Sequence, residues 1–130
     1  MSAAVALLFL TACASLPKTH YYTLELPPPP SPHSSRTSFV LGVERFRAPE
    51  VLRDDRIVFY ESPTQLNYYQ YHRWGSDPAT LLADLVVRRL SHLEIFREVR
   101  RLPAGGAVDY FLRGRLLSFE EVDYQGGVKG

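Results

Sequence analysis

The 130-residue sequence predicts an α/β fold of the α+β type, in which a mostly antiparallel sheet packs against one amphipathic helix. Short segments of strand-forming residues fill most of the chain, and a single stretch spaces its apolar side chains three and four residues apart. Aromatic residues make up 12% of the chain, which is typical of a globular domain rich in strands. The net charge of +1 comes from interspersed signs, so no basic face for nucleic acid is expected.

The first strands are expected around a proline-rich connection. Tyr21–Leu26 consists of strand formers and ends in alternation, which predicts a short strand. Residues 27–35 have polyproline character and predict an exposed, semi-rigid connection. Phe39–Phe46 is expected to be the first main strand, with a bulge at Gly42. Ala48–Asp55 carries a proline and two aspartates and predicts a loop.

Next, Arg56–Glu61 and Leu66–His72 predict a β-hairpin, because four residues separate them. Alternation in the second strand places Tyr68 on one face and Tyr69 with Tyr71 on the other. At least one of these rows is therefore a candidate surface for a protein partner.

A helix is predicted from Asp77–Pro78 to about His92. The aspartate can accept hydrogen bonds from free backbone N–H groups, and proline suits the first helical position. The expected apolar stripe consists of Leu82, Leu85, Val86, Leu90 and Leu93.

After the helix, the sequence predicts a brief strand at Phe96–Leu102, a turn at Pro103–Gly106 and a long strand at Val108–Val122. A sheet that ended in such an unpaired long strand would have an aggregation-prone edge. We therefore expect the sequence to be truncated at its C-terminus relative to a complete domain.

The beginning of the chain predicts export. Ala3–Ala12 is apolar, about half as long as a membrane-crossing helix, and matches the apolar region of a secretory signal. Export signals normally begin with a positive region, and Met1-Ser2 is uncharged, so we expect the true start to lie upstream. Leu10–Cys13 then resembles the bacterial lipobox, in which an apolar residue and two small residues precede a cysteine that is acylated.

These observations predict a signal peptide at residues 1–12, lipidation of Cys13 and a lipidated tether at residues 13–20. The alternative is that Cys13 is a small buried hydrophobe, as lone cysteines usually are. Acylation of the chain's single cysteine would leave no free thiol and no internal disulfide. Ala14 follows Cys13 where an aspartate would retain a lipoprotein in the inner membrane, so the outer membrane is expected.

Several segments together resemble the ABC-type transport auxiliary lipoproteins, the PqiC-like group of the paraquat-inducible intermembrane transport system. Besides Cys13, the matching residues are Tyr21–Leu24, Asp55–Val58, and Arg73-Trp74 before the helix. The similarity covers roughly Cys13 to Leu117. Two departures are Gly75, where alanine is more usual, and a family domain that continues beyond Gly130.

The resemblance implies an α/β domain at residues 21–130, lipid-anchored on the periplasmic face of the outer membrane. It implies a non-catalytic auxiliary subunit that supports envelope integrity. Its partner would be the periplasmic mammalian-cell-entry-domain subunit of a lipid transporter, and a homo-oligomer is also compatible. The alternative is a stand-alone lipid- or ligand-binding envelope lipoprotein, with an apolar cavity between helix and sheet.

A search of the sequence for catalytic or metal-binding groups gives no enzyme, cofactor or metal site. The four histidines lack ligand-like spacing, and no second cysteine could complete a zinc site. Asp54-Asp55 and Glu120-Glu121 are interpreted as solvated pairs. Trp74 has two interpretations. It is either an anchor for a partner or a core residue between the hairpin and the helix, and the core position is favoured.

Overall fold

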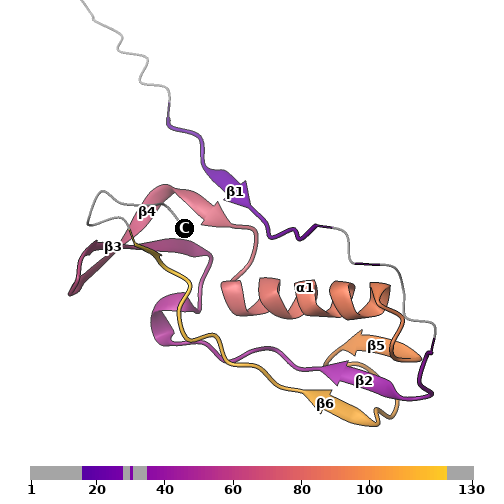
Figure 1. Cartoon of the computed structure of the whole chain (residues 1–130). Helices are drawn as coiled ribbons and strands as arrows, with labels where there is room; N and C mark the ends of the chain where they lie inside the picture. Colours follow the sequence, from indigo (N-terminus) through magenta and orange to yellow (C-terminus); the bar gives the residue numbers. More distant parts are fainter. Residues whose placement is uncertain (1–15, 28–29, 31–34, 123–130) are drawn as a thin grey trace, which may run out of the picture.

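The computed structural model describes residues 16–27, 30 and 35–122, which form two sheets and one α-helix (Figure 1). The predictions for residues 1–12 and Cys13, and most of those for the connection at 27–35, lie outside these residues. The first sheet has the order β1-β4-β3-β7, with strands β1 (His20–Tyr22), β3 (Arg56–Ser62), β4 (Gln65–Trp74) and β7 (Glu121–Val122). The second has the order β5-β2-β6, with strands β2 (Val40–Val43), β5 (Glu98–Arg101) and β6 (Tyr110–Leu112). Helix α1 spans Pro78–His92, and a short 3-10 helix, η1, spans Glu50–Leu52.

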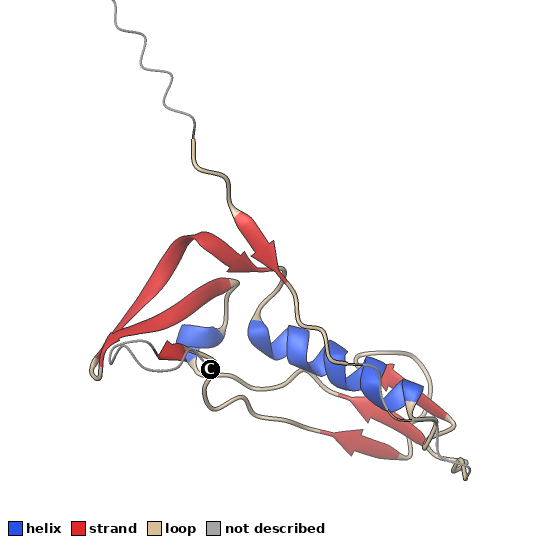
Figure 2. Cartoon of the chain, turned by 45° about the horizontal axis from the view of Figure 1, so that its top comes forward, coloured by secondary structure: helices blue, strands red, loops and turns tan. Residues whose placement is uncertain are grey.

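The α/β class with a helix beside curled sheets is confirmed, but the prediction of a mostly antiparallel sheet is wrong. Only the β3–β4 hairpin is antiparallel among the strand pairings of the described residues. The pairings of β1 with β4, β3 with β7, and β2 with both β5 and β6 are parallel. Parallel partners need long connections, and here each connection contains other elements of the fold: the β3–β4 hairpin and α1, for example, lie between β2 and β5 (Figure 2).

Helix α1 begins and ends where the sequence predicts. Asp77 Oδ1 accepts a hydrogen bond from the backbone N–H of Thr80 at 3.0 Å, and Asp77 Oδ2 accepts one from the Thr80 hydroxyl at 2.7 Å. Pro78 occupies the first turn. Arg45 Nη2 lies 3.1 Å from Asp77 Oδ1 and so ties the helix start to the chain that leaves β2.

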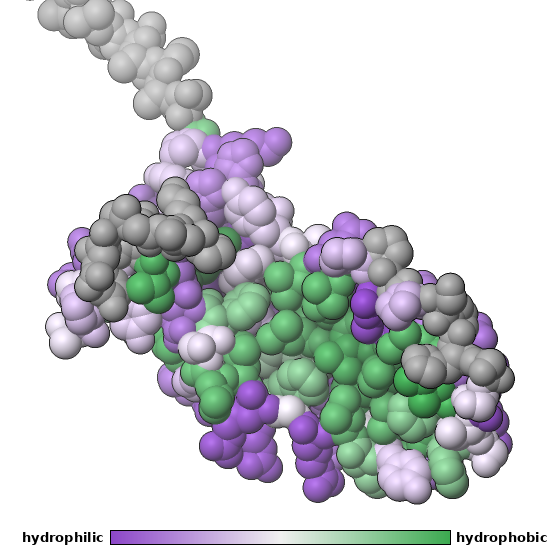
Figure 3. Space-filling model, in the orientation of Figure 1, coloured by the Kyte–Doolittle hydropathy of each residue, from purple (hydrophilic) through white to green (hydrophobic). Residues whose placement is uncertain are grey.

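The helix face that meets the sheet matches the predicted stripe only in part: Val86 and Leu90 are shared, but the face is centred on Ala83. Ala83 is fully buried in one cluster with Leu41 and Val43 of β2, and apolar side chains of both layers pack around it. From the helix these are Val86, Val87 and Leu90. Leu82, Leu85 and Leu93 lie half-buried outside this cluster. Because alanine is small, the face with Ala83 can approach the sheet more closely than a leucine face can. On the outer surface of the molecule, Figure 3 shows further apolar residues gathered over the region of α1.

The hairpin is longer than predicted and contains an irregularity. Its strands are joined by Pro63 and Thr64 alone, instead of four residues. Arg56 pairs with Arg73 whereas Val58 pairs with Tyr68, so four residues of β4 lie opposite one residue of β3. This bulge interrupts the predicted alternation of side chains along β4.

The predicted long strand at Val108–Val122 is wrong, because the chain leaves one sheet and enters the other. Tyr110–Leu112 pairs with β2, and Glu121–Val122 pairs with β3. Between them, an isolated parallel bridge joins Arg47 and Arg115. A Cβ atom on Gly114 would lie 2.6 Å from the ring of Phe46, so this crossing requires glycine where the two segments touch.

The cap of α1 gives a stability prediction with a matched control. Replacing Asp77 by Ala should lower the free energy of unfolding by about 1 kcal/mol, because a helix cap is lost. Asp77→Asn should retain most of that stability at neutral pH, since asparagine is an equally good cap. Urea unfolding monitored by circular dichroism measures both, and equal stability of wild type and Asp77→Ala would contradict the capping role.

The same residue predicts a pH dependence. Burial acts to raise the pKa of Asp77, but the hydrogen bonds from Thr80 and the Arg45 guanidinium outweigh it and hold the pKa below its usual value. The stability that the charge contributes is therefore present above about pH 4 and is lost as the pH falls through the lowered pKa. The difference in stability between wild type and Asp77→Asn should narrow between pH 7 and pH 3.

Candidate functional site

The N-terminal segment joins the fold at the end of β4, just before the helix. In the parallel pairing of β1 with β4, His20 lies beside His72, Tyr21 beside Arg73, and Tyr22 beside Trp74. The N–H of Gly75 donates to the carbonyl of Tyr22 at 2.7 Å and extends the pairing by one residue. An alanine would also fit at position 75, since its Cβ atom would make an ordinary contact of 3.4 Å with that carbonyl oxygen.

A group of rings reinforces this junction. The hydroxyl of Tyr22 lies 2.6 Å from Nδ1 of His72, and the rings of His20 and His72 stack at 5.4 Å. The ring of Tyr69 meets His72 edge-on at 5.8 Å, and its hydroxyl donates to Glu121 Oε2 at 2.9 Å. The rings therefore connect β1, through β4, to the last described strand.

After β1, the chain is held beside α1 as a strap, which we define as residues 23–27 (Figure 1). Arg88 Nη2 donates to the carbonyl of Leu24 at 3.2 Å, and Arg89 Nη1 donates to the carbonyl of Pro27 at 2.6 Å. Both arginines lie near the C-terminal end of the helix, so the strap runs along it from its start towards its end. Residues 20–27 are thus part of the folded domain.

The residues proposed from the sequence as a partner surface are half-buried in the structure: Tyr68, Tyr69, Tyr71 and Trp74. The Arg56 guanidinium lies 3.8 Å from the ring centre of Tyr68, and Tyr69 packs against Phe59 at 4.7 Å. Trp74 packs against Phe119 at 5.2 Å. The ring of Trp74 therefore packs on the segment that leads to β7. The binding of a partner by these four residues stays a prediction.

The two aspartates before β3 form ion pairs with nearby arginines. Arg56 Nη2 lies 2.7 Å from Asp54 Oδ2, and Arg73 Nη1 lies 2.8 Å from Asp55 Oδ1. The hydrogen bond from the Arg56 side chain holds the pKa of Asp54 below its usual value. The Asp55 pair connects the start of β3 to the end of β4, next to the β1 junction.

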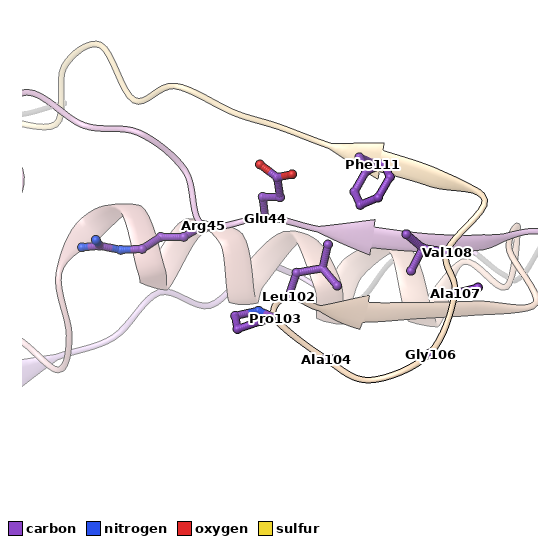
Figure 4. A pocket seen from close by; sticks show the side chains of 9 residues that line it. All are labelled: Glu44, Arg45, Leu102, Pro103, Ala104, Gly106, Ala107, Val108 and Phe111. Atoms are coloured by element: carbon purple, nitrogen blue, oxygen red, sulfur yellow. The ribbon is translucent and has the colours of Figure 1, made fainter.

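A groove that sequence reasoning missed lies on the face of the β5-β2-β6 sheet away from α1 (Figure 4). Its volume is about 750 Å³, and Glu44 and Arg45 lie at one end of it. Its apolar lining comprises Leu102, Pro103, Ala104, Ala107, Val108 and Phe111. At Gly42 a Cβ atom would lie 2.7 Å from Leu102 Cδ1, so only glycine lets that side chain lie across β2. The bulge expected at Gly42 is absent, because Gly42 pairs in regular register with both β5 and β6.

Two further properties concern metal binding and membrane spanning. Across residues 16–27, 30 and 35–122, no three histidine, cysteine or acidic side chains gather closely enough to hold a metal ion. Over the same residues, the helices are too short or too polar to span a bilayer.

The sequence matches the family described as the ABC-type transport auxiliary lipoprotein component over residues 22–129. Because this match covers most of the chain, the protein belongs to that family, as the resemblance of its motifs indicated. No curated protein matches the chain.

Two crystal structures are similar in fold. One is of a Xanthomonas campestris protein of family DUF330, with a TM-score of 0.70 and 23% identity over 82% of this chain and 59% of that one. The other is of an uncharacterised protein, with a TM-score of 0.61 and 22% identity over 82% of this chain and 62% of that one. The chain thus spans less than two thirds of each of these proteins.

The contact between Trp74 and Phe119 can be measured by a double-mutant cycle. Trp74→Ala should lower the free energy of unfolding by about 1–3 kcal/mol, less than the 3–5 kcal/mol typical of a fully buried tryptophan, because Trp74 is half-buried. Combined with Phe119→Ala, the cycle should show a coupling of about 0.5–1.5 kcal/mol. Urea unfolding of the four proteins gives both values, and additive effects would contradict the contact.

Proposed function

We propose that this protein is a non-catalytic auxiliary subunit of an intermembrane lipid transport system, anchored on the periplasmic face of the outer membrane through an acylated Cys13. Its partner would be the transporter's periplasmic subunit with mammalian-cell-entry domains. The family match over residues 22–129 carries this proposal, because it places the chain among auxiliary components of ABC-type transport. The lipobox-like Leu10–Cys13 and Ala14 support the anchor and the choice of membrane.

Features of the described domain are compatible with a docking role. Such a subunit needs a rigid body close to its anchor, and residues 20–27 are hydrogen-bonded into the domain. The half-buried side chains of Tyr68, Tyr71 and Trp74 keep part of their surface available to a partner. Tyrosine and tryptophan are enriched where partners contact proteins.

The groove favours a second candidate, a stand-alone lipid- or ligand-binding lipoprotein. Its lining is mostly apolar, and its charged end could face a polar headgroup. This groove lies on the face of the sheet opposite α1, whereas the cavity expected from the sequence was between helix and sheet. Lipid that co-purifies with the domain and is lost on introducing a charge at Val108 would favour this candidate.

The anchor is tested first. Cys13→Ala should abolish metabolic labelling with palmitate, because the chain has no other cysteine to accept the lipid. The variant should accumulate as uncleaved or soluble protein in cell fractionation. Normal labelling of Cys13→Ala would remove the basis for the membrane assignment.

The role in transport is tested genetically and biochemically. Deleting the gene should give the same envelope defect as deleting the transporter, and the double deletion should be no worse, because an auxiliary subunit acts only through its partner. Pull-down of the full-length protein from detergent-solubilised envelopes should recover the subunit with mammalian-cell-entry domains. Clearly additive defects, or hydrolytic activity of the purified domain, would contradict the proposal.

A further inference from the structure

We propose that the outer surface of β1 and the residues before it lies against the lipid headgroups of the membrane that holds Cys13. We call this the β1 surface and define it as Leu16, Lys18 and Tyr21. The proposal rests on the proposed function, because it requires an acylated Cys13. It adds a contact with the bilayer itself, and hence a fixed orientation of the domain, to the lipid anchor.

Chain length restricts how far the β1 surface can lie from the membrane. Seven peptide units separate Cys13 from His20, and fully extended they span at most about 24 Å. Leu16 is only three residues from the acylated position. Whatever path the intervening residues take, the start of β1 therefore stays close to the headgroup layer.

The rest of the domain is held to β1 by backbone pairing and hydrogen bonds. The parallel pairing with β4 fixes β1, and the strap continues it along α1 through Arg88 and Arg89. A free linker would let any face of the domain turn towards the bilayer. Here the folded domain begins at His20, so the side of the molecule that carries β1 is the side nearest the anchor (Figure 1).

The exposed side chains of the β1 surface suit the boundary between lipid and water. Leu16 is 93% exposed and Tyr21 66%, although one is apolar and the other aromatic. Tyrosine is enriched at this boundary because its ring is apolar and its hydroxyl remains hydrated. Lys18 is also exposed and can reach lipid phosphates while its aliphatic stem contacts the apolar layer. A bilayer thus explains why these side chains are left uncovered.

Site-specific fluorescence can test this contact, because acylation of Cys13 leaves an introduced cysteine as the single free thiol. The full-length acylated variant Tyr21→Cys would be labelled with a small fluorophore and reconstituted in phosphatidylethanolamine–phosphatidylglycerol vesicles that contain a headgroup-nitroxide lipid. Gly105→Cys is the matched control. Gly105 is exposed in the turn between β5 and β6, and a Cβ atom there would meet nothing within 4 Å.

We expect severalfold stronger quenching by the nitroxide lipid at position 21 than at position 105. Equal quenching at the two positions, in protein that floats with the vesicles, would overturn the membrane contact and leave the proposed function intact. Shielding of position 21 from both the lipid quencher and aqueous iodide would overturn it in favour of a protein occupant. Protein that takes up no palmitate and does not float would overturn the proposed function, and this inference with it.

Discussion

The close packing of α1 on the parallel β5-β2-β6 sheet is the constraint on which the rest of the structure depends. Ala83 and Val43 are both fully buried there, and all four residues of β2 are buried. Such a continuously buried strand is typical of a central parallel strand covered on both faces. The helix in turn positions Asp77 for Arg45 at one end, and Arg88 and Arg89 for the strap at the other. The N-terminal segment therefore depends on a core to which it contributes little.

Local features of this fold could be predicted from the sequence, whereas strand partners could not. The bounds of α1 and the existence of the β3–β4 hairpin depend on neighbouring residues, and both are confirmed. Periodicity shows which residues share a face but not which strand lies beside them, so the parallel pairings were missed. The helix face was predicted only in part: Val86 and Leu90 pack on the core as expected, but its centre, Ala83, was not predicted because the prediction followed the larger leucines. Strand-forming residues lie on both sides of Gly114, so the sequence predicted one long strand where the chain passes from one sheet to the other.

The candidate site was predictable only where it depends on single residues. The rings of His20, Tyr22 and His72 meet because residues 52 positions apart pair in parallel, a relationship that no local pattern encodes. The bulge in β4 also brings Tyr69 towards His72, against the alternation expected of a regular strand. By contrast, the family could be recognised from the order of several short motifs. Such motifs are read directly from the sequence and do not require knowledge of which strands pair.

The parallel pairings also determine when the domain can assemble. Residue 20 pairs with residue 72, residue 40 with residue 98, and residue 59 with residue 121. Contacts between such distant positions form slowly, because long loops must close before any of them is made. In a chain that emerges N-terminus first, the hairpin and helix can form early, but β2 waits for β5 and β6, and β3 waits for β7. The central strand of the second sheet therefore gains its partners only once residues 98–112 have been synthesised, and the pairing of β3 with β7 only once residues 121–122 have been.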